Sequence, residues 1–145
     1  MMANHEIFIG IEGKADESFG SQYVGTALED AGINKKHRIN GMIKMLYGDA
    51  PEKHADIRYQ LVTAACATLL EAKMRGLHKA MLMVIIFKKP GCYSNKKIAD
   101  NKKDMKLFLS HSNAIENTGC WTVPTVYGRE NNIVLYFSEI TIELQ

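Results

Sequence analysis

The chain has 145 residues, of which 46% are hydrophobic and 23% charged, values typical of one soluble globular domain and not of a disordered or collagen-like chain. Eighteen lysines and arginines against sixteen acidic residues give a net charge of +2, too small to indicate a nucleic-acid or membrane partner by itself. Three cysteines without a C-x-x-C pair argue against a disulfide framework or a structural zinc site. The longest apolar run, residues 80–87, is far shorter than the ~20 residues that span a bilayer. We therefore predict a single cytoplasmic domain over residues 1–145 that has no membrane partner.

Charge is distributed unevenly along the chain. Residues 1–32 hold six acidic residues against Lys14 alone, whereas residues 88–106 hold seven lysines against two aspartates. A shorter basic cluster spans residues 35–38. Acidic and basic regions on one chain suit a divalent-metal site beside a phosphate-binding surface, and they equally suit ordinary solvated loops and helix faces.

The first half of the chain predicts one strand followed by three helices. Residues 6–12 (EIFIGIE) are almost continuously apolar, which predicts a central strand covered on both faces. Apolar residues recur at helical spacing between Gly20 and Gly32, again over residues 39–46, and along one stripe from His54 to Arg75. These helices form a crossover long enough to join two parallel strands.

The second half predicts a strand, a helix and a final pair of strands. Residues 80–87 (AMLMVIIF) are wholly apolar and predict a strand, and residues 98–109 predict a helix. Two β-rich segments, 121–127 and 133–144, predict a C-terminal hairpin. The expected fold is thus α/β, with a central mixed β-sheet flanked by helices and the order β-α-α-α-β-α-β-β.

The first predicted strand ends in Glu12-Gly13-Lys14. Side chains two positions apart on a strand project from the same face, so Glu12 and Lys14 can point into one site. A carboxylate there can ligate Mg²⁺, and an ammonium beside it can orient or deprotonate an attacking water and offset charge on a phosphoryl group. The pattern alone has little specificity, because Glu71-Ala72-Lys73 repeats it on the long predicted helix.

Two neighbouring features give this pattern a context. Asp16 and Glu17 follow directly, so four ionisable side chains fall within six residues where an apolar strand leaves the core, and this is costly unless they are solvated or coordinated. Gln60 borders the apolar stripe of the long predicted helix. If it faces the sheet, its amide can hydrogen-bond a strand-end carboxylate or a substrate phosphate.

Four segments together resemble an uncharacterised group within the PD-(D/E)XK, or restriction-endonuclease-like, superfamily: residues 11–20 (IEGKADESFG), the basic stretch with Arg38, residues 58–61 (RYQL) and residues 81–87. The resemblance covers residues 6 to 110 or so. It implies a restriction-endonuclease-like core that cleaves DNA or RNA with Mg²⁺ or Mn²⁺. It also implies that Glu12 is the metal-binding acid, Lys14 the catalytic lysine, and Gln60 the helix glutamine of some nuclease branches.

The chain departs from the superfamily at the first acid of the motif. That acid is an Asp on the strand before E-x-K, and only eleven residues precede Glu12, so we expect a domain without that strand. Glu6 cannot replace the Asp, because six residues at ~3.3 Å each place it about 20 Å from Glu12, whereas metal ligands lie within ~2–2.6 Å of the ion. Asp16 or Glu17 becomes a metal ligand beside Glu12 if the chain turns back. Otherwise a partner chain supplies the acid, or the metal site is incomplete.

The sequence therefore predicts a Mg²⁺-dependent nuclease with Glu12, Lys14 and Gln60 as catalytic residues. The alternative is a non-catalytic binding or regulatory homo-oligomer that keeps the nuclease-like fold. A homodimer could form if the C-terminal hairpin pairs across a two-fold axis, although edge strands are commonly protected within one chain. The basic residues expected to contact nucleic acid are Lys35, Lys36, Arg38, Arg58, Lys96 and Lys97.

Overall fold

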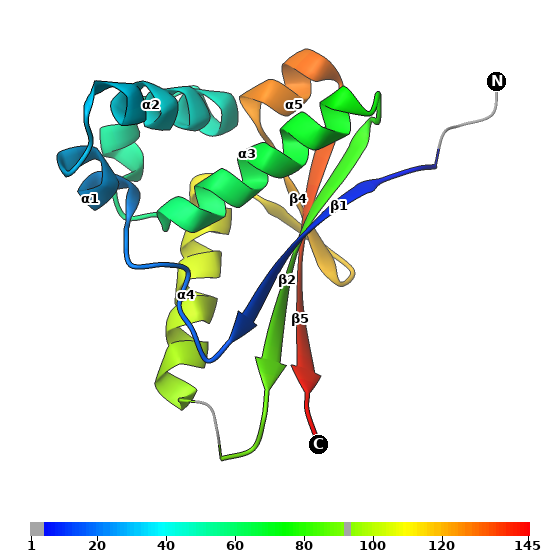
Figure 1. The fold of residues 1–145 in the computed structure, drawn as a ribbon. Coiled ribbons are helices and arrows are strands. Elements are labelled where there is room, and N and C mark those ends of the chain that lie inside the picture. Colours follow the sequence, from blue (N-terminus) through cyan, green and yellow to red (C-terminus); the bar gives the residue numbers. More distant parts are fainter. Residues whose placement is uncertain (1–4, 92–93) are drawn as a thin grey trace.

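A computed structural model describes residues 5–91 and 94–145 (Figure 1). The elements follow one another in the order β1 (Phe8–Ala15), α1 (Val24–Glu29), α2 (Ile33–Tyr47), the 3-10 helix η1 (Pro51–His54), α3 (Tyr59–Met74), β2 (Lys79–Lys88), α4 (Asn95–His111), β3 (Ile115–Asn117), β4 (Cys120–Val123), α5 (Val126–Asn131) and β5 (Val134–Glu143). The predicted order of strands and helices is confirmed from β1 through α4.

The strands form one five-stranded sheet in the order β1-β2-β5-β4-β3. β1, β2 and β5 are parallel, whereas β4 runs antiparallel to β5 and β3 antiparallel to β4. The predicted α/β fold with a mixed sheet is therefore confirmed. The long connection through α1, α2 and α3 is the crossover that parallel pairing of β1 and β2 requires.

The helices lie against one face of the sheet (Figure 1). α3 packs on β1 and β2, and α5 contacts β5. The ring of Phe108 on α4 lies 6.0 Å from that of Phe137 on β5, measured between centroids. The core beneath the helices contains the buried alternate residues of β2 and β5: Ala80, Leu82, Val84, Ile86, Leu135 and Phe137. Burial of each large apolar side chain in this layer contributes about 1.5–3 kcal/mol to folding.

β1 is an edge strand, so the prediction of a central strand covered on both faces is wrong. It pairs with β2 alone, and Ile9 and Ile11 are 42% and 63% exposed. Their apolar character suggested a second covering layer, but in the single chain the helices cover only the opposite face (Figure 1). A continuous apolar run indicates that both faces of a strand avoid water, and it does not say whether the same chain provides both covers.

The predicted C-terminal hairpin is confirmed only in part: β4 pairs antiparallel with β5, but the helix α5 and not a turn connects the two strands. The segment 121–127 leaves the sheet after Val123, because Thr125 caps the short helix α5 by accepting a hydrogen bond at Oγ1 from the Gly128 amide at 2.9 Å. The hairpin of this region is β3–β4, and β5 lies between β2 and β4. β5 pairs with β2 along its whole length but with β4 only over residues 135–137, so it lies inside the sheet over these three residues.

A helix approaches the sheet closely at Gly10 on β1. A Cβ atom at this position would collide with Oγ1 of Thr68 on α3. Glycine therefore lets α3 lie directly against β1, with the N-terminal end of α3 near the C-terminal end of the strand. This packing brings together the residues of the site described below.

Two further sequence-based expectations concern cysteines and membranes. Cys66 and Cys120 are free thiols, and Cys92 lies outside the described residues. In the described part of the chain, no helix has both the length and the apolar character needed to cross a membrane.

Replacement of Gly10 by alanine should lower the free energy of unfolding by about 1–3 kcal/mol, because the added methyl group overpacks the contact with Thr68. Urea denaturation measures the effect. Gly41→Ala is the matched control, since no atom lies within 4 Å of a Cβ there and alanine in a helix is favoured by about 0.5–1 kcal/mol. The double variant Gly10→Ala/Thr68→Ala should lose less free energy of unfolding than the two single variants lose together, because alanine at position 68 removes the atom that the new methyl group meets. A loss equal to the sum of the two single losses would contradict the packing explanation.

Candidate active site

Glu12, Lys14 and Gln60 meet where β1 ends and α3 begins. The Lys14 ammonium Nζ lies 2.7 Å from Oε1 of Glu12 and donates a hydrogen bond to Oε1 of Gln60 at 3.1 Å. The Gln60 amide Nε2 donates to Oε1 of Glu12 at 2.7 Å. We call this closed network the triad. The prediction that Gln60 could hydrogen-bond a strand-end carboxylate is confirmed.

The triad places a buried positive charge next to an accessible negative one. The Lys14 side chain is 3% exposed, whereas that of Glu12 is 21% exposed. The Lys14 ammonium also lies 5.2 Å from the centre of the buried Phe19 ring. A buried ammonium requires a carboxylate and hydrogen-bond acceptors to offset lost hydration, and Glu12 and Gln60 supply both. Within the described structure, Oε2 of Glu12 makes no hydrogen bond, so this oxygen is the one available to a ligand.

Arg58 fixes the start of α3 and does not project into solvent to meet a phosphate. Its Nε donates to Oδ2 of Asp104 at 2.7 Å, and its Nη1 donates to the Gly20 carbonyl at 3.1 Å. The guanidinium also stacks 4.0 Å from the centre of the Tyr23 ring. Arg58 and Asp104 are 13% and 7% exposed, so this is a largely buried ion pair. Arg58 therefore positions Gln60, two residues later, and its guanidinium is too buried to form a surface for nucleic acid.

Asp16 and Glu17 do not join Glu12. Asp16 adopts the left-handed conformation with φ of 54°, and its Oδ1 accepts a hydrogen bond from the Ser94 amide at 3.0 Å. Lys97 lies 3.7 Å from Oδ2 of Asp16 and donates to its carbonyl at 2.8 Å. Glu17 is exposed, and its carbonyl accepts from Asn101. The turn after β1 thus joins the N-terminus of α4, and no group of three or more His, Cys, Asp or Glu in the described residues is placed to hold a metal ion.

Two of the predicted basic residues lie close to the triad. Arg38 donates from Nη2 to the Tyr59 hydroxyl at 3.1 Å, and Lys35 donates to Oε1 of Gln22 at 3.3 Å and lies 5.7 Å from the centre of the Tyr59 ring. Tyr59 and Gln22, together with Gln60, line a hollow of about 280 Å³. Cations at this hollow suit an anionic group bound beside Gln60. The other predicted cations are exposed, Lys36 on α2 and Lys96 at the start of α4.

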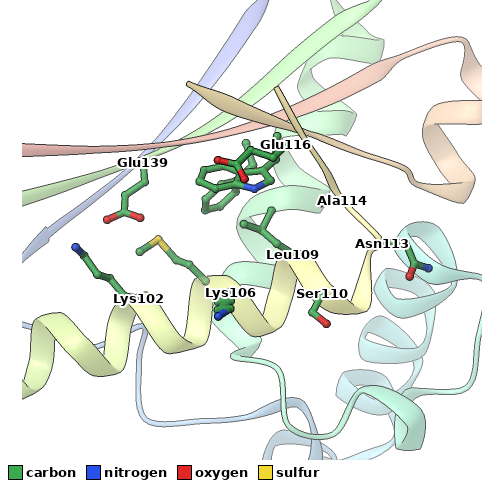
Figure 2. A pocket seen from close by; sticks show the side chains of 11 residues that line it. Lys102, Lys106, Leu109, Ser110, Asn113, Ala114, Glu116 and Glu139 are labelled. Carbon is green, nitrogen blue, oxygen red and sulfur yellow. The ribbon is translucent and has the colours of Figure 1, made fainter. Parts of the chain in front are cut away.

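A second hollow lies further along the same face of the sheet (Figure 2). It has a volume of about 400 Å³ and is bounded by α4 and the strands β4 and β5. Lys102 extends from α4 toward Glu139 on β5 (Figure 2), and the apolar side chains of Met105 and Trp121 also line the hollow. Glu12 and Glu139 both pair with the fully buried Val84, so they share one row of the sheet two strands apart.

Sequence analysis does not single out Glu139, because this residue lies within a β-rich run that predicts one strand of a hairpin. Its backbone position is about 10 Å from that of Glu12, at the usual spacing between neighbouring strands. The only signal in the sequence is an acidic residue that interrupts an apolar strand. The register assigns it to the covered face, where the second hollow opens.

A histidine pair also emerges only from the fold. Nδ1 of His54 lies 2.9 Å from Nδ1 of His111, although the two residues are 57 positions apart. Asp49 lies 3.4 Å from Nε2 of His54, Asp56 lies 3.0 Å from Nε2 of His111, and the Tyr47 ring stacks on His54 at 4.1 Å between centroids. At this distance one of the two ring nitrogens donates a hydrogen bond to the other. If both rings were fully protonated, two N–H groups would face each other and this hydrogen bond would be lost. Burial lowers the pKa of His54 below its usual value, and the nearby charge of His111 also lowers it.

Comparison with known proteins gives a family without an assigned function. A family model described as a domain of unknown function, DUF6946, matches residues 1–143, so the chain belongs to this family. No curated protein and no solved structure matches the chain.

The His54 pair predicts acid sensitivity. The pKa of His54 is lower in the folded chain than in the unfolded chain, so below about pH 6.5 the unfolded chain binds more protons. The free energy of unfolding should therefore fall as the pH falls. For one proton the slope is at most about 1.4 kcal/mol per pH unit. The test is urea denaturation at several pH values for the wild type and for His54→Gln. The stability difference between the two proteins should shrink toward acid. Parallel pH curves would show that His54 does not titrate differently on folding.

Proposed function

We propose that this member of the DUF6946 family is a Mg²⁺-dependent nuclease that hydrolyses phosphodiester bonds of DNA or RNA at the triad. The observation that carries the proposal is the convergence of Glu12 and Lys14 from β1 with Gln60 from α3 into one hydrogen-bonded network. The resemblance of the surrounding segments to the PD-(D/E)XK superfamily supports the same assignment. These three residues have the chemical types that a metal-assisted hydrolysis requires.

The donor set at the triad fits a hard divalent cation. Mg²⁺ commonly keeps several waters and binds through one or two carboxylates together with substrate phosphates. Oε2 of Glu12 is one such carboxylate oxygen, and the Glu12 side chain reaches solvent. A bound Mg²⁺ or Mn²⁺ would polarise the phosphate and lower the pKa of a water molecule. Asp16 does not supply a second carboxylate beside Glu12, because it is engaged at the start of α4.

The chain's own residues then have separate tasks. In hydrolysis, a water oxygen bonds to phosphorus, one ester P–O bond breaks, and the departing oxygen takes up a proton. Lys14 holds a fixed positive charge beside Glu12, where it can orient the water and offset negative charge that develops on the phosphoryl oxygens. Gln60 holds the Glu12 carboxylate in place through Nε2. Lys35 and Arg38 hydrogen-bond Gln22 and Tyr59, which line the adjoining hollow, and from there they can hold the substrate backbone.

A second candidate function is binding of nucleic acid without cleavage, in a regulatory or homo-oligomeric protein that keeps the fold. The closed geometry of the triad favours it, since Glu12, Lys14 and Gln60 satisfy one another without any ligand. The engagement of Asp16 by Ser94 and Lys97 favours it as well. This candidate requires phosphate contacts at Lys35 and Arg38 but no metal.

We also propose a cytoplasmic location. Cys66 and Cys120 are free, and burial raises the pKa of the Cys66 thiol to about 12. Free thiols are typical of reducing compartments.

The nuclease proposal predicts that Glu12→Gln and Lys14→Met each reduce cleavage of single-stranded DNA, duplex DNA or RNA by about 100-fold or more in Mg²⁺ or Mn²⁺, because each removes a charge from the reacting centre. The chain contains its own control. Glu71→Gln and Lys73→Met alter the same Glu-x-Lys pattern on α3, where the Glu71 side chain is 44% exposed and pairs with Arg75, and should leave cleavage unchanged.

Far-ultraviolet circular dichroism and thermal unfolding confirm that each variant is folded. The double variant Glu12→Gln/Lys14→Met adds a check, because it removes both charges of the buried pair together. Cleavage by the wild type that persists in both site variants would contradict the proposal. The second candidate function would be supported instead if the wild type binds nucleic acid without cleaving it and Lys35→Ala/Arg38→Ala weakens that binding.

A further inference from the structure

The face of the sheet opposite the helices is apolar along three neighbouring strands. We call it the open face; it consists of the alternate positions from Ile9 to Ala15 on β1, from Met81 to Phe87 on β2 and from Val134 to Ile142 on β5. The strand register aligns them in rows, such as Ile9 with Met81 and Tyr136. None of the described helices lies on this side of the sheet (Figure 1).

The side chains of the open face are exposed to an extent that is unusual for such residues in a parallel sheet. Ile11 is 63% exposed, and Ile9, Ile140 and Ile142 are 39–42% exposed. No Asp, Glu, Lys or Arg occupies the alternate positions that define the open face, and Lys79, which pairs with Val134 at the start of β2, borders it. Parallel strands occur almost always with both faces covered, and extended apolar patches on soluble proteins mark interaction sites.

The open face is large enough to form a reversible interface. Three strands spaced about 4.8 Å apart and up to ten residues long at about 3.3 Å each give a footprint of about 450 Å². Side chains standing on this footprint present more accessible area than the footprint itself. Two copies together thus bury about 1,000 Å², the lower size limit of a biological interface and typical of a reversible one.

We propose that a second copy of this chain covers the open face, so that two sheets pack face to face across a two-fold axis. An isologous interface brings each patch onto itself, and a patch without charges meets no like-charge repulsion when it does so. Homodimer interfaces are also more apolar than other interfaces. Nucleic acid does not fit this surface, because it requires cations.

The proposed dimer is independent of the nuclease proposal. Glu12 and Lys14 alternate with Ile11 and Gly13 along β1, so they lie on the covered face, away from the interface. Both triads therefore remain accessible in the dimer. The dimer also differs from an assembly through the C-terminal strand, because β5 contributes its face and not an edge.

Sedimentation velocity of the full chain tests the proposal. The wild type should sediment with twice the 16.3 kDa mass of one chain at concentrations of about 10 µM and above. Ile11→Lys and Ile140→Lys, on separate strands of the open face, should each raise the dimer dissociation constant by about 100-fold or more, because each would bury an unpaired ammonium. Ile33→Lys is the matched control, since Ile33 is 73% exposed on α2 and lies away from the open face.

Circular dichroism establishes that the variants are folded, and Ile11→Thr, which keeps a β-branched side chain, provides a milder second change on β1. A wild type that remains monomeric at about 100 µM would overturn the proposal. A dimer that neither Ile11→Lys nor Ile140→Lys weakens would also overturn it. Co-sedimentation of a monomeric wild type with phospholipid vesicles, abolished by Ile11→Lys, would assign the open face to a membrane surface instead.

Discussion

The ion pair between Lys14 and Glu12 is the interaction on which the organisation of the site depends. An ammonium with 3% exposure is stable only if its charge and hydrogen bonds are matched, and the partners must come from places that the fold holds fixed. Glu12 is fixed because it lies two residues earlier on β1. Gln60 is fixed because Gly10 lets α3 lie against β1 and because Arg58 anchors the first turn of α3 to Asp104 and Gly20. The helix packing and the chemistry of the site are therefore consequences of one arrangement.

The two faces of the sheet carry different kinds of side chain. The covered face holds the triad, the hollow beside Gln60 and the hollow that contains Glu139. The open face holds only uncharged positions between Ile9 and Ile142. Alternation of side chains along β1 produces this division, since adjacent residues such as Ile11 and Glu12 face opposite ways. The proposed substrate site and the proposed self-association surface therefore occupy the same strand without interference.

Sequence patterns predicted those features that depend on local periodicity. The helical stripe that became α3, the apolar run that became β2 and the shared face of Glu12 and Lys14 all follow from side-chain spacing. Features that depend on tertiary placement were not predictable in this way. The turn at Asp16 joins α4 because the chain adopts a positive φ there, and the pairing of His54 with His111 requires α4 to end beside η1. Likewise, the apolar sequence of β1 indicated two covered faces but could not reveal that one cover is missing from the single chain.

We propose that Oε2 of Glu12, which the triad does not engage, binds the metal ion. Titration with Mn²⁺, followed by electron paramagnetic resonance, tests this directly because it requires no substrate. The wild type should bind Mn²⁺, and Glu12→Gln should bind it at least about 10-fold more weakly, whereas Glu71→Gln should match the wild type. Equal affinity of the wild type and the folded Glu12→Gln variant would contradict the claim. The triad would then be a structural ion pair at the end of β1.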